Sequence, residues 1–77
     1  METIIPIYST NTNPLRKGEV VYTTSAHFKF DNRNRLFDTE VKLIGEANCK
    51  HMETYKDPSP SGNINYTYDK WQILEVI

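Results

Sequence analysis

Hydrophobic and polar residues alternate along two neighbouring stretches of the chain, residues 19–30 and 35–49. Even positions of the first stretch and odd positions of the second are mostly apolar. A period of two residues is typical of a β-strand with one buried face. The residues between the two stretches, Asp31-Asn32-Arg33-Asn34, are of types that favour turns. The pattern therefore predicts a long central hairpin.

The alternation also predicts a register for this hairpin. Phe28 faces Phe37 in it, and Tyr22 faces Leu43. A slip of one residue would expose every apolar side chain to water. The expected core combines apolar residues of both arms with residues of the C-terminal segment: Val20, Tyr22, Phe28, Phe37, Val41, Leu43, Trp71 and Ile73.

Three further segments complete the predicted fold. Residues 4–8 form a β-branched run that contains Pro6, and proline cannot donate to a ladder, so an edge strand is expected. Residues 64–77 add one or two strands, with a bulge or tight turn at Asp69-Lys70. Residues 46–56 continue the second arm or form a short helix, and the strand is favoured because no clear cap supports a helix. The prediction is an all-β fold, an antiparallel sheet of four to five strands that is barrel-like or sandwich-like.

Length and composition narrow the class of protein. Seventy-seven residues predict one small domain over residues 1–77 with a thin core. A net charge of −1 argues against non-specific binding to duplex DNA. A single cysteine, Cys49, cannot form an intramolecular disulfide, which is typical of a reducing compartment. Residues 4–7 are too short for a signal peptide or a membrane span. We therefore expect a cytoplasmic protein that does not contact membranes.

Groups with catalytic or metal-binding chemistry do not converge in the predicted sheet. Ser25, His27 and Asp38 share a polar face, but strand residues two apart are too distant for Ser25 to reach the imidazole. Cys49 and His51 share the other face, and one cysteine with two histidines cannot complete a four-ligand zinc site without carboxylates. Cys49 is expected to act as a small buried hydrophobe. The sequence predicts a protein that is not an enzyme and has neither a cofactor nor a bound metal.

The first of two remaining functions is a non-catalytic protein-binding module, such as a small inhibitor or accessory factor of viral, phage-like or mobile-element type. It would use a sheet edge, residues 4–8 or the C-terminal strand, beside a proline-rich loop at residues 57–63. The same edge could pair two copies of the chain into a homodimer. The expected contact residues are Tyr8, Pro58, Pro60, Tyr66 and Tyr68.

The alternative is a small β-barrel that binds single-stranded nucleic acid. Lys29, Arg33 and Arg35 at the hairpin tip would contact phosphates, and tyrosines of the C-terminal segment would stack on bases. The near-neutral net charge favours a protein partner over nucleic acid.

Overall fold

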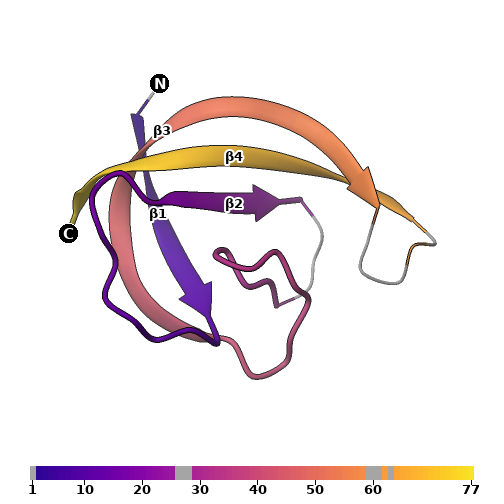
Figure 1. Ribbon diagram of the computed structural model, residues 1–77, viewed down its shortest axis with the longest axis horizontal. Coiled ribbons are helices and arrows are strands. Elements are labelled where there is room, and N and C mark those ends of the chain that lie inside the picture. Colours follow the sequence, from indigo (N-terminus) through magenta and orange to yellow (C-terminus); the bar gives the residue numbers. More distant parts are fainter. Residues whose placement is uncertain (1, 26–28, 59–61, 63) are drawn as a thin grey trace.

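The computed structural model describes residues 2–25, 29–58, 62 and 64–77 (Figure 1). These residues form four strands and no helix: β1 (Glu2–Ser9), β2 (Val20–Thr24), β3 (Lys42–Pro58) and β4 (Asn65–Val76). The strands make one antiparallel sheet in the order β1-β3-β4-β2. The predicted all-β class and antiparallel sheet are confirmed, with four strands in an open sheet. The strand over residues 46–56 is also confirmed, and the helix alternative is wrong.

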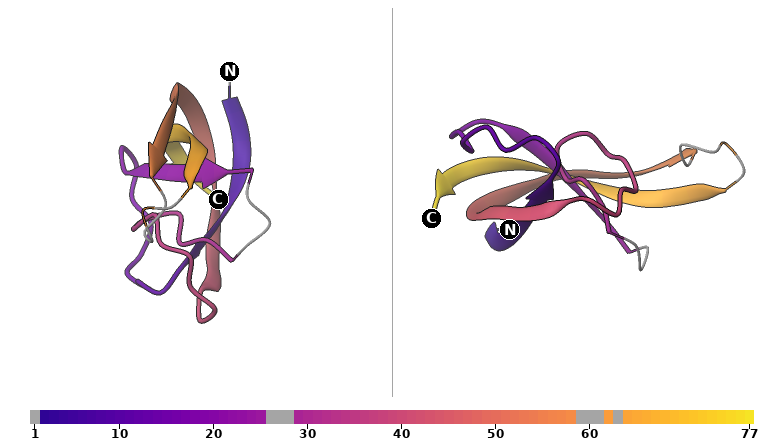
Figure 2. Two further views of the ribbon diagram at one scale, coloured as in Figure 1. Left: turned by 90° about the vertical axis from the view of Figure 1, so that its right-hand side faces the viewer. Right: turned by 90° about the horizontal axis from the view of Figure 1, so that it is seen from below.

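The sheet is organised by one long hairpin, β3 and β4. Residues 42–50 of β3 pair with β1 and residues 47–58 pair with β4, so that residues 47–50 have both neighbours. Two residues of β3 have no cross-strand partner because the register shifts at them: Ile44 in the pairing with β1 and Met52 in the pairing with β4. Such extra residues bend a strand and increase its twist, and β3 forms a strongly curved arch (Figure 1). The end of the hairpin extends beyond the remaining strands (Figure 2).

The central hairpin predicted over residues 19–49 is wrong in its pairing. β2 pairs with β4, so that Tyr22 lies opposite Lys70 and not opposite Leu43. Between the described residues of the predicted arms there is one isolated bridge, Phe30 with Phe37. The physical reason is that alternation specifies which side chains share a face and does not specify which strand lies alongside. Phe28 and its predicted contact lie outside the described residues.

Apolar side chains form two clusters on opposite faces of the sheet. One cluster fills the inside of the curl with buried residues of all four strands: Ile5, Ile7, Val21, Ala47, Cys49 and Ile73. The other packs the segment at residues 29–37 against the outer half of the hairpin through aromatic rings: Phe30, Phe37, Tyr66 and Tyr68. Leu43, an expected core residue, is 56% exposed, whereas Val21 on the expected polar face is fully buried. The curled sheet buries one face at one end and the opposite face at the other end. The prediction that a single face is buried along the whole sheet is therefore wrong.

The two edges of the sheet are joined by one residue, Asn32. Its backbone N–H donates to the Tyr8 carbonyl, and its Oδ1 accepts from the Tyr8 N–H at 2.7 Å. Its backbone carbonyl accepts from the Tyr22 N–H, and its Nδ2 donates to the Tyr22 carbonyl at 2.6 Å. Asn32 therefore acts as a one-residue strand between the end of β1 and the middle of β2.

Candidate partner-binding edge

The strand β1 presents an open edge over its first half. Strand residues alternate in the direction of their backbone N–H and C=O groups. Tyr8 directs both groups away from β3, to Asn32. Ile4 and Pro6 have the same phase as Tyr8, so their groups also point to the open side. A proline fits this position, because the missing N–H then faces the open side and the ladder with β3 loses no hydrogen bond. The expectation that residues 4–8 form an edge strand is confirmed.

Asn32 sets the length of this edge. Because it occupies both backbone groups of Tyr8, the groups of β1 that have no partner among the described residues are those of Glu2 and Ile4 and the carbonyl of Pro6. On the opposite side of the sheet, Asn32 likewise occupies both groups of Tyr22 in β2. An added strand would therefore find its longest stretch of open backbone groups at residues 2–6.

Apolar side chains lie beside this edge on the face that points away from the core. Ile4 and Leu43 are each 56% exposed, and Tyr8 is 41% exposed. Tyr8 and Leu43 are cross-strand partners, and partners in a ladder point to the same face. Ile77 is exposed as well, and its N–H donates to the Glu46 carbonyl next to Pro6. Together they form an apolar strip, defined here as Ile4, Pro6, Tyr8, Leu43 and Ile77.

The other described residues predicted to contact a partner lie far from the β1 edge or are buried. Pro58 ends β3 and is exposed, and Pro60 lies outside the described residues. Tyr66 is half-buried against Phe37, at 5.0 Å between ring centroids. Tyr68 is 2% exposed, and burial raises the pKa of its hydroxyl, so its ring belongs to the aromatic cluster and not to the surface. The C-terminal strand expected as a second edge is an interior strand, because β4 lies between β3 and β2.

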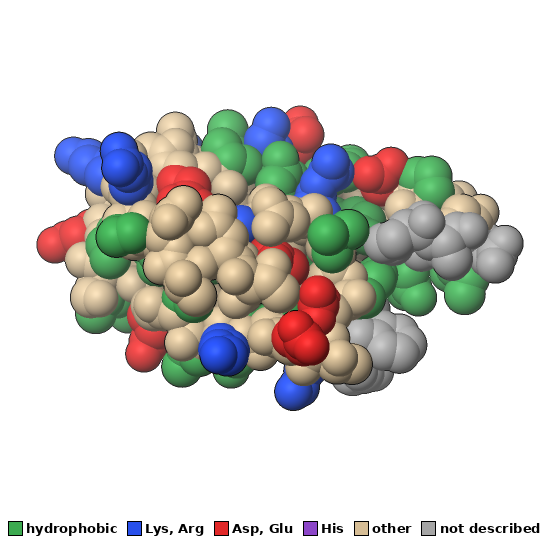
Figure 3. Space-filling model, turned by 60° about the horizontal axis from the view of Figure 1, so that its bottom comes forward, with side chains coloured by type: hydrophobic (Ala, Val, Ile, Leu, Met, Phe, Trp, Pro, Cys, Tyr) green, Lys and Arg blue, Asp and Glu red, His purple; other side chains and the backbone are tan. Residues whose placement is uncertain are grey.

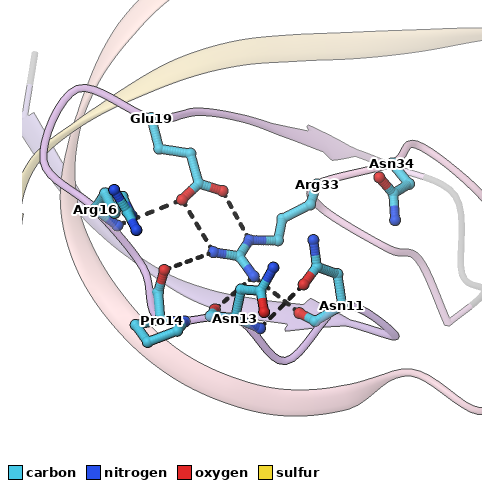
Figure 4. Close-up of a pocket in the computed structure, with 7 residues that line it drawn as sticks. All are labelled: Asn11, Asn13, Pro14, Arg16, Glu19, Arg33 and Asn34. Carbon is cyan, nitrogen blue, oxygen red and sulfur yellow. Dashed lines mark hydrogen bonds and ion pairs between the residues drawn. The ribbon is translucent and has the colours of Figure 1, made fainter.

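Arg33, an expected phosphate contact, is instead a structural residue. Its side chain is 7% exposed, and each of its five N–H groups has a partner (Figure 4). Nε and Nη2 donate to the two carboxylate oxygens of Glu19, and the other three groups donate to backbone carbonyls of Asn11, Asn13 and Pro14. The guanidinium therefore anchors the loop between β1 and β2 and has no donor left for a phosphate.

The other two basic residues of the predicted tip are more accessible. Lys29 is exposed and donates from Nζ to the Thr39 carbonyl. Arg35 lies over the Tyr22 ring and forms an ion pair with Asp57 at 3.2 Å. On the face shown in Figure 3, acidic and basic side chains are interspersed. Of the three basic residues predicted to contact nucleic acid, Lys29 and an ion-paired Arg35 therefore remain accessible.

A polar cluster that the sequence did not reveal lies on the hairpin. His51 Nε2 lies 3.0 Å from Asp69 Oδ1 and 3.1 Å from Thr54 Oγ1. The hydrogen bond from Thr54, opposed by partial burial and aided by His51, lowers the pKa of Asp69. Asp69 Oδ1 accepts from the Thr54 hydroxyl, and the same oxygen lies within hydrogen-bond distance of His51 Nε2. The spacing of His51 and Thr54 in the sequence does not indicate that they share a face, because the Met52 bulge changes the alternation of β3.

The lone thiol and metal-binding groups can be placed as well. Cys49 is fully buried, as expected, and burial raises the pKa of its thiol. Among the described residues, no three His, Cys, Asp or Glu side chains are close enough to hold a metal ion. His27 and its expected pair with Asp38 lie outside the described part of the chain.

Comparisons with known proteins add no assignment: no protein-family model, no curated protein and no solved structure matches this chain. In the described part of the chain, no helix has the length and apolar character required to cross a membrane. The β1 edge, with its open backbone groups and exposed apolar side chains, is therefore the candidate site of this protein.

Proposed function

We propose that this protein is a non-catalytic binding module that adds an extended segment of a protein partner to the β1 edge. The observation that carries the proposal is the coincidence of an open backbone edge with exposed apolar side chains. Glu2 to Pro6 offer unpaired backbone groups, and Ile4, Tyr8 and Leu43 lie exposed beside them. Main-chain hydrogen bonds would provide affinity, and side chains next to Ile4 would provide specificity.

The role of the proline-rich loop is part of the same proposal. Pro58 lies at the far end of β3, whereas the β1 edge pairs with Lys42 to Lys50. A segment that binds at β1 would therefore contact Tyr8 of the expected residues, and a contact at Pro58 would need a second part of the partner. An inhibitor or accessory role is the biological setting in which such a small non-catalytic module would act.

Substitution of Ile4 by proline tests the edge directly. The Ile4 N–H points away from β3, so Ile4→Pro should preserve the sheet and remove a donor that an added strand requires. Thr3 is already extended, as the residue before a proline should be. The matched control, Ile4→Ala, removes the side chain and retains the N–H. Circular dichroism would confirm that both variants fold.

The assay is selection of a random dodecapeptide library on the immobilised protein. Peptides that bind the native chain and Ile4→Ala, and fail to bind folded Ile4→Pro, would support strand addition. Peptides that bind all three equally would contradict it. Labelled oligothymidylate provides the nucleic-acid comparison: tight, salt-sensitive binding that Lys29→Glu weakens would overturn the proposal. Arg33 is not used for this purpose, because its substitution would disturb the loop that it anchors.

A further inference from the structure

The apolar strip of the β1 edge is surrounded by carboxylates. Glu46 lies opposite Pro6, and Glu75 lies opposite Asn48, which is itself opposite Ile4. Since cross-strand partners share a face, both glutamates lie on the face of the apolar strip. Glu2 belongs to the same face, and its Oε1 accepts from Asn48 Nδ2 at 2.8 Å.

These carboxylates are not neutralised within the chain. All three glutamates are exposed, and among the described residues none of them forms an ion pair. The basic residue that the register places among them is Lys50, opposite Glu2. Three carboxylates against one ammonium give this face a local excess of negative charge.

We infer that the segment which adds to β1 is apolar and basic, with a lysine or arginine two positions from the residue opposite Ile4. This inference rests on the proposed function. Glu2 and Ile4 lie two apart on β1, so a cation opposite Glu2 and an apolar side chain opposite Ile4 satisfy both cross-strand positions. Charge complementarity at the rim of an interface contributes mainly to partner choice and to the rate of association.

Pro6 and the three glutamates also disfavour the pairing of a second copy of the chain with the β1 edge. Antiparallel self-pairing centred on Ile4 would place the Glu2 carbonyl of each copy opposite Pro6 of the other, which has no N–H to donate. It would also bring the Glu2, Glu46 and Glu75 carboxylates of both copies onto one continuous face. Charged and proline-containing edges are a known means by which proteins avoid edge-to-edge pairing.

Three capped heptapeptides that differ at one position test the inference. They have the sequences Thr-Val-Thr-Ile-Thr-Lys-Thr, Thr-Val-Thr-Ile-Thr-Gln-Thr and Thr-Val-Thr-Ile-Thr-Glu-Thr, so that antiparallel pairing with the peptide isoleucine opposite Ile4 places the variable residue opposite Glu2. Each is titrated into the isotope-labelled protein while the amide resonance of Ile4 is followed. The lysine peptide should bind about fivefold more tightly than the glutamate peptide, and salt should reduce the difference. Glu2→Lys should reverse the order, whereas the control Glu53→Lys, at an exposed position far along β3, should not.

The outcomes distinguish the two proposals. Equal binding of the three peptides at Ile4, or preference for glutamate, would refute the basic partner and leave strand addition standing. Failure of every peptide to shift the Ile4 resonance would refute strand addition itself. Sedimentation of the native chain as a dimer that Ile4→Pro converts to a monomer would show that a second copy occupies the edge, and would overturn the inference.

Discussion

The carboxylate of Asp31 should contribute strongly to the stability of the fold, and Asp31→Asn tests this. The residue is fully buried. Its Oδ1 accepts from Ser9 Oγ and from the backbone N–H groups of Arg33 and Asn34, at 2.7 to 2.9 Å. Its Oδ2 accepts from the backbone N–H and the hydroxyl of Thr10 and from Asn34 Nδ2. The asparagine side chain keeps one oxygen and has an NH₂ group in place of the other. In either orientation this NH₂ would face at least two N–H donors, with which it cannot form a hydrogen bond.

The size of the effect follows from the pKa of Asp31. Burial alone would raise this pKa, but the hydrogen bonds from Thr10, Ser9, Asn34 and Arg33 outweigh burial and lower it from 3.8 to about 2. Since one pKa unit corresponds to about 1.4 kcal/mol, ionisation of Asp31 contributes about 2.5 kcal/mol to the free energy of unfolding. The unsatisfied N–H groups add to this loss, so Asp31→Asn should cost on the order of 2–4 kcal/mol at neutral pH.

The pH dependence of this difference provides the more specific test. The folded-state pKa lies below the unfolded-state value, so the contribution is fully present above 3.8 and is lost as the pH falls through about 2. Urea unfolding monitored by Trp71 fluorescence should therefore give a difference between native chain and variant that shrinks in acid. Asp38→Asn is the control, because Asp38 Oδ1 accepts from the exposed Glu40 N–H. A difference of less than about 1 kcal/mol at neutral pH, or one that is the same in acid, would refute the argument.

Three further predictions concern the same loop network and the core. Asn32→Ala removes the side-chain bonds to β1 and β2 and should lower the free energy of unfolding by about 2 kcal/mol; amide exchange at Tyr8 should accelerate, and an unchanged rate would argue against the bridge. Arg33→Lys cannot reproduce five planar donors and should destabilise by about 2 kcal/mol in thermal unfolding, whereas Arg16→Lys at the exposed neighbour should be neutral. The Cys49 thiol, buried and with a raised pKa, should react with Ellman's reagent only after unfolding, and rapid native-state labelling would contradict its placement.

Local features of the sequence were sufficient to predict two elements of the fold. Pro6 in a β-branched run identified an edge strand because the missing N–H restricts a proline to few positions in a sheet. The absence of a helix cap identified residues 46–56 as strand. Alternation could not identify β4 as the partner of β2, because it specifies which side chains share a face and not which strand lies alongside. Leu43 was misplaced for the same reason, because its assignment to the core followed from the wrong partner.

The polar network could not be predicted because its contacts join residues that are distant in sequence. Asp31 and Asn32 were recognised as turn residues, and the turn is present. Their side chains, however, bond to Ser9, Tyr8 and Tyr22, which are 10 to 24 residues away. Asp and Asn favour tight turns because their side chains form hydrogen bonds with nearby backbone groups. The same side chains can form hydrogen bonds with the backbone of other strands instead. Arg33 shows the same ambiguity, since an arginine at a loop tip fits a solvent-exposed contact as well as a buried anchor.

The turn residues also explain how the protein can expose an apolar edge without a long template for aggregation. An edge strand of eight residues would offer unpaired groups along its whole length. Asn32 satisfies the last of these groups at Tyr8, and Pro6 removes a donor two residues earlier. What remains open is short, and its acidic surroundings oppose pairing with another copy of itself. A partner must therefore supply both a matching strand and the opposite charge, and this double requirement would make a small surface selective.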